Sequence, residues 1–141
     1  MRYLVLAALL FAGLFSGCTP KADQNYDVAF SVKNNTILKL TDASMFGKEY
    51  PGSFGNSVPN GNKVIVTRSP QLGSAVDVSW IDPVGKKHTM KFMFPNPVRM
   101  IDSMEVVLQF SADESVALYI DYANSPRVDA TVIHDEKASD Q

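Results

Sequence analysis

Short runs in which apolar and polar residues alternate recur along the chain from residue 26 onward. In residues 26–33 every second residue is apolar, beginning with Tyr26 and ending with Val32, as expected of a strand with one buried face. Comparable runs between turn-forming residues predict further strands at 36–40, 63–67, 75–81, 88–94, 104–110, 116–122 and 128–133. No segment after residue 18 repeats its apolar residues with the period of a helix. The pattern predicts an all-β fold, a single antiparallel β-sandwich of about seven to eight strands.

Turn-forming residues indicate how the first strands are connected. Asn34 and Asn35 stand between the strands predicted at 26–33 and 36–40, and such residues favour a tight β-hairpin. We therefore expect these two strands to pair. The regular spacing of the later turns is typical of sandwiches of the immunoglobulin-like or transthyretin-like kind.

Residues 1–17 have a different character. Arg2 precedes an uncharged, mostly apolar run at residues 3–15, and the small residues Ser16 and Gly17 follow. This order of charged, apolar and small residues is that of a secretory signal peptide. Because the run is shorter than the roughly 20 residues that a membrane-spanning helix needs, we interpret residues 1–17 as a cleaved signal peptide.

Cys18 is the only cysteine of the chain and directly follows this segment. Residues 14–18, Leu-Phe-Ser-Gly-Cys, resemble the bacterial lipobox, in which a small residue precedes an invariant cysteine. The resemblance implies that Cys18 is acylated and becomes the new N-terminus, and that Thr19 directs the protein to the outer membrane. Several acyl chains hold a protein firmly on a lipid bilayer. The alternative is a soluble secreted protein with a free thiol near its N-terminus.

The remainder of the chain divides into one domain and two polar ends. Residues 18–25 form a polar tether behind the lipidated cysteine, and residues 26–133 are long enough for one sandwich domain. Residues 134–141 are charged and poor in apolar residues, as in a disordered tail. The formal net charge is −2, from 13 Lys and Arg against 15 Asp and Glu. A chain without clustered basic residues is not expected to bind nucleic acid.

Residues that carry chemistry are few. The two histidines, His88 and His134, belong to no metal-ligand pattern, so we expect no metal and no cofactor. At the start of a predicted strand, His88 is most simply a residue hydrogen-bonded to a neighbour; the alternative is a small periplasmic hydrolase with His88 as general base. No Gly-x-Ser-x-Gly motif supplies a nucleophile for such an enzyme. The sequence therefore predicts a protein that is not an enzyme.

Residues 41–62 form a long interval without a predicted strand, and such connections are usually functional or disordered. The interval carries Met45, Phe46, Tyr50 and Phe54 among four glycines and two prolines. Exposed aromatic residues on a loop suit a protein-binding surface. Two structural interpretations remain open: the rings cap an open end of the sandwich, or the interval contains a short strand.

A second candidate for partner binding is Arg99, which lies between apolar neighbours in the proline-containing segment 95–103. Because proline cannot donate a ladder hydrogen bond, this segment is expected to be a connection. Arginine often anchors protein interfaces, and an equally ordinary role for Arg99 is a salt bridge to Asp102.

The second half of the chain contains a Val-x-Val-x-Trp strand at 76–80, a strand that closes on Pro95, and two apolar strands at 106–110 and 116–120. Residues 34–36, Asn-Asn-Thr, precede them. This arrangement is similar to that of small bacterial lipoproteins that act as immunity proteins against type VI-secreted phospholipase effectors. The resemblance implies a non-enzymatic role, in which the protein binds the toxin in the periplasm and blocks its active-site entrance.

Two hypotheses for function follow. The first is an outer-membrane lipoprotein on the periplasmic face that binds a protein partner, in particular an immunity protein that neutralises a secreted antibacterial effector. The alternative is an accessory or structural lipoprotein of an envelope assembly or secretion system, held by edge-strand pairing.

Overall fold

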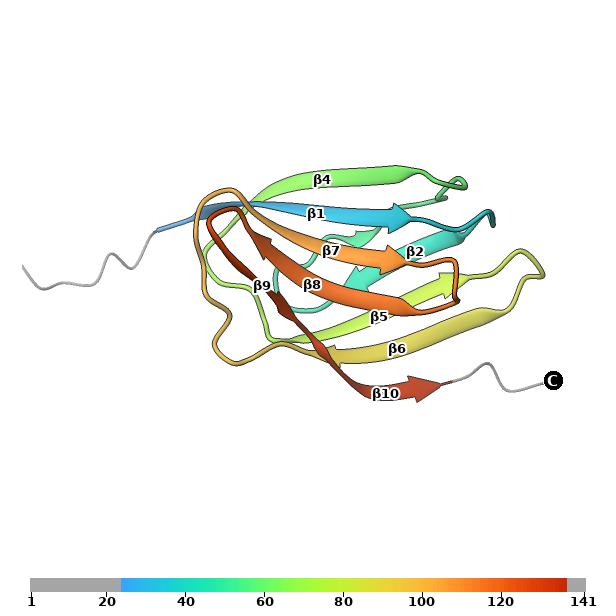
Figure 1. The fold of residues 1–141 in the computed structure, drawn as a ribbon. Coiled ribbons are helices and arrows are strands. Elements are labelled where there is room, and N and C mark those ends of the chain that lie inside the picture. The colour runs from blue at the N-terminus through green and yellow to red at the C-terminus, as the bar shows by residue number, and fades with distance from the viewer. Residues whose placement is uncertain (1–23, 137–141) are drawn as a thin grey trace, which may run out of the picture.

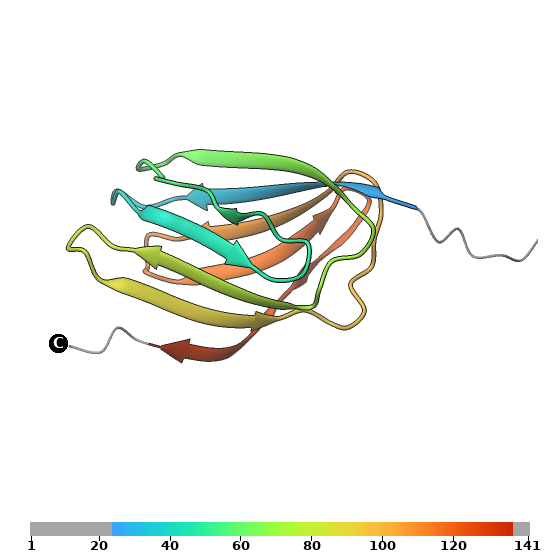
Figure 2. The same cartoon turned by 180° about the vertical axis from the view of Figure 1, so that it is seen from behind.

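Residues 24–136 are described by the structure, a computed structural model, and they fold into strands without a helix (Figure 1). The ten strands are β1 (Tyr26–Asn34), β2 (Thr41–Phe46), β3 (Gly52–Ser53), β4 (Asn62–Ser69), β5 (Ala75–Ile81), β6 (Lys87–Met93), β7 (Met104–Phe110), β8 (Val116–Tyr122), β9 (Ser125–Asp129) and β10 (Thr131–Glu136). They form two five-stranded sheets with the orders β4-β1-β7-β8-β9 and β10-β6-β5-β2-β3. The sheets lie face to face (Figure 2), so the predicted all-β sandwich is confirmed.

One strand pair departs from the predicted antiparallel arrangement. β1 and β7 run parallel, with Val28 opposite Met104 and Asn34 opposite Phe110. The other pairs are antiparallel. The first strand of the domain therefore lies inside its sheet, between β4 and β7.

The alternation of apolar residues accounts for the core. In β1, Val28, Phe30 and Val32 are fully buried, and they face the apolar side of the second sheet, which includes the buried Val78 and Phe92. Burial of such a side chain contributes about 1.5–3 kcal/mol relative to an exposed one. Apolar packing between the two sheets therefore holds the described domain together.

The strand predicted at 36–40, and its hairpin with the first strand, are wrong. β1 pairs with β4 and β7 instead. The buried Asn34 explains the difference, because its Nδ2 donates to the backbone oxygens of Leu38 and Val58 at 2.8 and 3.1 Å. Its Oδ1 accepts from the backbone nitrogen and the Oγ1 of Thr36 at 3.1 and 2.6 Å. These bonds satisfy backbone groups locally, and the segment forms a loop.

The interval 41–62 contains β2 and β3, so the interpretation that it hides a short strand is correct. β2 pairs with β5 on one side and with β3 on the other. Three consecutive residues of β2, Ala43, Ser44 and Met45, are buried, and its register with β5 shifts between Thr41 and Ser44. A strand with such a register shift lacks a regular period of two, so the sequence pattern did not reveal it.

The strand predicted at 128–133 is divided between the two sheets. β9 belongs to the first sheet and β10 to the second, and Ala130 alone connects them. The N–H of Ala130 donates to the backbone oxygen of Leu118 at 2.9 Å. Because β10 continues to Glu136, the tail predicted at 134–141 begins within a strand.

The predicted signal peptide, Cys18 and residues 137–141 of the predicted tail lie outside the described residues. Between residues 24 and 136, no helix of the length and apolar character needed to cross a membrane is found.

Candidate binding groove at one end of the sandwich

An open groove of about 1050 Å³ lies at the end of the sandwich where β1, β5 and β7 finish. Three loops that are distant in sequence line it: residues 35–40 after β1, residues 82–86 between β5 and β6, and residues 111–115 between β7 and β8. In Figure 1 these loops gather on the side opposite to the one where the chain enters β1. The groove therefore belongs to the end of the domain that is remote from its N-terminus.

Stacked rings form the floor of the groove. Trp80 lies opposite His88 in the β5–β6 ladder, and the two rings stack with centroids 5.1 Å apart and 9° between their planes. Phe110, from the other sheet, meets the Trp80 ring edge-on, with centroids 5.0 Å apart and an interplanar angle of 72°. Leu40 and Met90 complete an apolar lining. Trp80 thus contacts both sheets at the open end of the sandwich.

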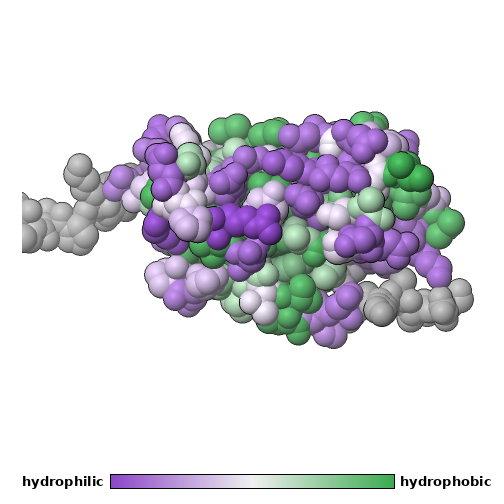
Figure 3. All heavy atoms as spheres, viewed as in Figure 1, coloured by the Kyte–Doolittle hydropathy of each residue, from purple (hydrophilic) through white to green (hydrophobic). Residues whose placement is uncertain are grey.

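Exposed apolar side chains stand on the rim. Ile37 is 85% exposed and Val84 is 80% exposed, and Leu38 is exposed beside them. Figure 3 shows hydrophobic residues gathered at this end of the molecule. Side chains at the tips of loops add little to the core, and contiguous exposed apolar surface commonly marks an interaction site.

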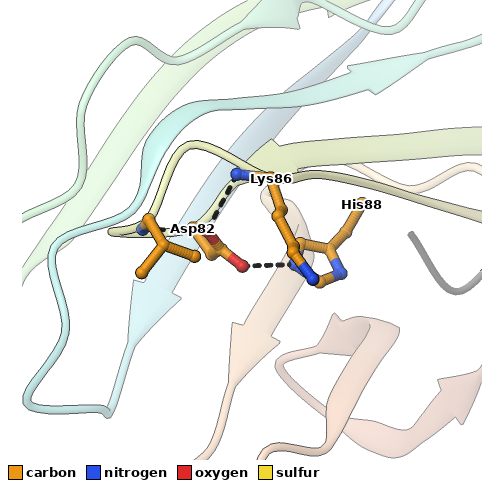
Figure 4. A network of polar contacts seen from close by, with 4 residues as sticks. Asp82, Lys86 and His88 are labelled. Atoms are coloured by element: carbon orange, nitrogen blue, oxygen red, sulfur yellow. Dashed lines mark hydrogen bonds and ion pairs between the residues drawn. The ribbon is translucent and has the colours of Figure 1, made fainter. Parts of the chain in front are cut away.

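Asp82 and His88 form the principal polar contact of the groove (Figure 4). Oδ1 of Asp82 accepts from the backbone nitrogens of Val84 and Lys86 at 3.0 and 2.9 Å. Its Oδ2 lies 2.9 Å from Nε2 of His88. The hydrogen bond from His88, with those from the two backbone groups, holds the pKa of Asp82 below its usual value. This contact agrees with the expected hydrogen-bonded role of His88 at a strand end.

The charges that line the groove are mainly acidic. Asp82, Glu114 and Asp135 are set against the single ammonium group of Lys86 within this lining. Next to Glu114, Asp113 accepts from the Oγ and backbone nitrogen of Ser115 at 2.6 and 3.1 Å, and these bonds lower the pKa of Asp113. An apolar floor is thus combined with a negatively charged margin.

Three of the residues proposed from the sequence for partner binding belong to the core or cover it. Met45 has 0% exposed surface and Phe54 is buried. The hydroxyl of Tyr50 donates to the Gly73 oxygen at 3.0 Å, and its ring meets that of Phe30 edge-on at 5.5 Å. Burial raises the pKa of Tyr50, and the nearby Tyr122 adds to the effect. Met45 and Phe54 offer no surface to a partner and Tyr50 is half-buried, which corrects the expectation that these side chains are exposed.

The other two proposed residues are exposed but lie outside the groove. Phe46, at the end of β2, is 52% exposed. The guanidinium carbon of Arg99 lies 4.5 Å from the centroid of the Tyr122 ring, and Nη2 donates to Ser125 Oγ at 3.1 Å. Asp102, the salt-bridge partner considered for Arg99, accepts instead from a backbone N–H of β1 at 3.2 Å.

Apart from His88, sequence reasoning did not single out the residues of the groove as functional. A signal was present in the turn Asp82-Pro-Val-Gly85, because the apolar Val84 stands at an exposed turn between two strands. Ile37 carried a comparable signal, but the strand predicted at 36–40 concealed it. The meeting of Trp80 with Phe110 depends on the packing of two sheets, which no local pattern reveals.

Within residues 24–136, no group of three or more His, Cys, Asp or Glu side chains is placed to hold a metal ion. Comparisons of the chain with protein-family models, with curated proteins and with solved structures find no match.

Proposed function

We propose that this chain is a lipoprotein of the bacterial outer membrane, anchored on the periplasmic face through acylated Cys18, that binds a protein partner in its end groove. The position of the groove is the observation that carries the proposal. β1 runs from Tyr26, next to the predicted tether, to Asn34 beside the groove (Figure 1). A lipid anchor ahead of Tyr26 therefore leaves the groove open to the periplasm.

The side chains of the groove favour binding over catalysis. Both carboxylate oxygens of Asp82 already accept hydrogen bonds, and the imidazole of His88 is stacked on Trp80. Asp82 therefore lacks the free lone pair that a general base needs, and the sequence supplies no Gly-x-Ser-x-Gly nucleophile for His88 to activate. An aromatic floor with exposed apolar side chains around it is, in contrast, the usual character of a protein-binding hot spot.

The charges of the lining indicate the partner's chemistry. Glu114 and Asp135 are both exposed at the margin of the apolar floor. Complementary charge steers association and selects among partners. We therefore propose that the occupant is an apolar side chain flanked by lysine or arginine on the surface of the partner protein.

The resemblance to immunity lipoproteins supports a secreted antibacterial effector as this partner. Binding at the exposed end of an anchored domain would hold the effector in the periplasm and cover its active-site entrance. In this role the chain acts by occupying a surface, and it needs neither a cofactor nor a reaction of its own.

The test uses the product of the reading frame next to that of this chain, secreted into the periplasm of cells with and without the full-length lipoprotein. We expect the lipoprotein to preserve growth, and the double variant Leu38→Asp/Val84→Asp to lower survival at least about tenfold, the effect of a loss of about 1.4 kcal/mol in binding. Phe46→Asp is the matched control, since it places the same charge on an exposed apolar residue outside the groove.

The control separates the groove from the surface proposed from the sequence. Full protection by Phe46→Asp together with loss of protection by the double variant supports the groove. The reverse pattern assigns binding to the end of β2. If deletion of the chain disturbs envelope assembly and no neighbouring product is toxic, the accessory role is correct and the immunity role is not.

A further inference from the structure

Strand β4 presents a long unpaired edge. It lies at one end of its sheet, and β1 is its only neighbour among the described strands. Its eight residues contain no proline and pair with β1 without a register shift. The other edges are protected: β3 has two residues, β9 contains Pro126, and β10 has a register shift between Val132 and His134. An unprotected edge is a template for another strand.

The hydrogen-bond pattern of the β1–β4 ladder identifies the backbone groups of β4 that do not bond to β1. The N–H of Asn34 donates to the oxygen of Gly61, its direct partner in the β1–β4 register, at 2.9 Å. Hydrogen-bonded and non-hydrogen-bonded pairs alternate along an antiparallel ladder. The odd-numbered residues of β4 therefore direct their backbone groups to β1. The residues whose N–H and C=O groups point outward are Asn62, Val64, Val66 and Arg68.

We infer that β4 pairs with β4 of a second copy of this chain, antiparallel and about a two-fold axis at Ile65. In this register Val64 of each copy lies opposite Val66 of the other, and Asn62 lies opposite Arg68. Every outward N–H and C=O of the strand then has a partner. An axis at Val64 leaves the outward groups of Arg68 without a strand partner, and an axis at Val66 places Asn62 opposite a proline that has no N–H.

The side chains on the outer face suit the same register. Val64 is 54% exposed and Val66 is 68% exposed, and Figure 3 shows hydrophobic residues along this edge of the molecule. Pairing brings the four valines of two copies together on one face. Cross-strand pairs of β-branched residues stabilise a sheet.

The charges of β4 do not oppose the pairing. Lys63 lies opposite Thr67 of the second copy, so no like charges face each other. Within its own chain, Lys63 donates from Nζ to the Phe54 oxygen at 3.1 Å, and Arg68 is paired with Asp27 at 3.4 Å. The edge of β4 is thus complementary to itself in backbone hydrogen bonding, apolar contacts and charge, as pairing with a second copy of the chain requires.

The pairing is independent of the proposed function and compatible with it. The second copy continues the sheet beyond β4 and leaves the groove at the end of the sandwich open (Figure 1). Because the strands are antiparallel, the two chains enter the paired domains from opposite ends. The predicted tethers of both copies then reach a bilayer that runs along the strands. Each groove in this dimer opens parallel to the bilayer, at the end where the tether of the other copy enters, and is still open to the periplasm.

Disulfide trapping of the full-length chain in its membrane tests the register. Residues at the axis of a non-hydrogen-bonded pair have Cα atoms about 4.5 Å apart, within reach of a disulfide. Ile65→Cys should therefore form a disulfide-linked dimer after mild oxidation. Val64→Cys alone and Val66→Cys alone should each give at least about tenfold less dimer, because the equivalent residues of the two copies are diagonal neighbours whose Cα atoms lie beyond the roughly 7 Å limit for a disulfide. When chains with Val64→Cys are mixed with chains with Val66→Cys, the two variants should form a disulfide with each other. Both positions are exposed, so this mixed pair tests the register even if Ile65→Cys unfolds the domain.

Charge substitutions provide the matched controls. In the Ile65→Cys chain, Val64→Lys/Val66→Lys places like charges opposite each other and should reduce the linked dimer at least about tenfold. Val64→Glu/Val66→Lys places opposite charges in the same positions and should restore it. The inference is overturned if Ile65→Cys links no more than the exposed Val84→Cys, if both double variants behave alike, or if the linked product contains a different protein.

Discussion

Asp82 and His88 face each other across the turn between β5 and β6, with 2.9 Å between Oδ2 of the carboxylate and Nε2 of the imidazole. The other carboxylate oxygen accepts two backbone N–H groups of the same turn. The imidazole in turn stacks on Trp80. One carboxylate therefore closes the turn and orients a ring in the floor of the groove.

Acid should weaken the domain through this pair. The pKa of Asp82 is lowered from its usual 3.8, chiefly by the hydrogen bond with His88, so its contribution to stability is present above pH 3.8 and is lost as the pH falls through the lower folded-state pKa. His88→Phe keeps a ring on Trp80 but removes the hydrogen bond. We expect the pKa of Asp82 to rise toward 3.8 in this variant, measured by carboxyl titration in NMR spectra. An unchanged titration would mean that the backbone bonds alone set the pKa.

Asn34→Ala should destabilise the domain and loosen the loop at residues 35–40. The substitution removes the hydrogen bonds that the buried Asn34 makes with the Leu38 and Val58 oxygens and with the Thr36 N–H, and each such bond contributes about 0.5–1.5 kcal/mol. Denaturant unfolding measures the loss, and hydrogen exchange should show faster exchange in the loop. Asn35→Ala is the matched control, because Asn35 is exposed; its effect should stay within about 0.5 kcal/mol. Equal effects of the two variants would contradict the role of Asn34.

Tyr50→Phe should reduce the stability of the domain at neutral pH and should also make that stability less sensitive to alkaline pH. The hydroxyl donates one buried hydrogen bond to Gly73, which contributes about 1 kcal/mol. Burial raises the pKa of Tyr50 above its usual 10.0, so the unfolded chain loses the proton first and stability falls as the pH rises above 10. The free energy of unfolding should therefore decrease less between pH 8 and a pH above 10 in the variant than in the natural chain.

The lipid anchor proposed at Cys18 has a direct chemical readout. The intact mass of the detergent-extracted protein should correspond to a chain that begins at Cys18 and carries acyl groups. Cys18→Ser should carry none. Thr19→Asp should keep the acyl mass but move the protein from the outer-membrane to the inner-membrane fraction of a density gradient. A mature chain with an unmodified thiol would support the soluble secreted protein instead.

The alternation of apolar and polar residues located β5, β7 and β8 at their observed bounds, because apolar residues at alternate positions of each strand face the core. It failed for β2, where the register with β5 shifts between Thr41 and Ser44 and the polar Ser44 is buried. It also joined β9 with β10, since a chain that crosses between sheets at Ala130 keeps an extended backbone and an apolar character. Local pattern reports which residues face a core, but the identity of the neighbouring strand depends on the whole chain.

The candidate site was less accessible to sequence reasoning than the fold. His88 was correctly expected to be hydrogen-bonded at a strand end, since a polar residue at the margin of a buried face needs a partner. Met45 and the aromatic residues of the interval 41–62 were proposed as a surface, but Met45 and Phe54 pack inside. An aromatic residue on a loop has the same sequence signature whether it packs inward or outward. The groove requires three loops to meet, and only the assembled sheets bring them together.

The place of β1 between β4 and β7 has a consequence for the export proposed for this chain. The segment of the domain that leaves the ribosome first acquires both neighbours only after β7, near residue 110, has followed it. Folds dominated by such distant pairings form slowly. The topology therefore keeps the chain from folding early, and the exported lipoprotein proposed above would reach a membrane channel as a chain that is still extended.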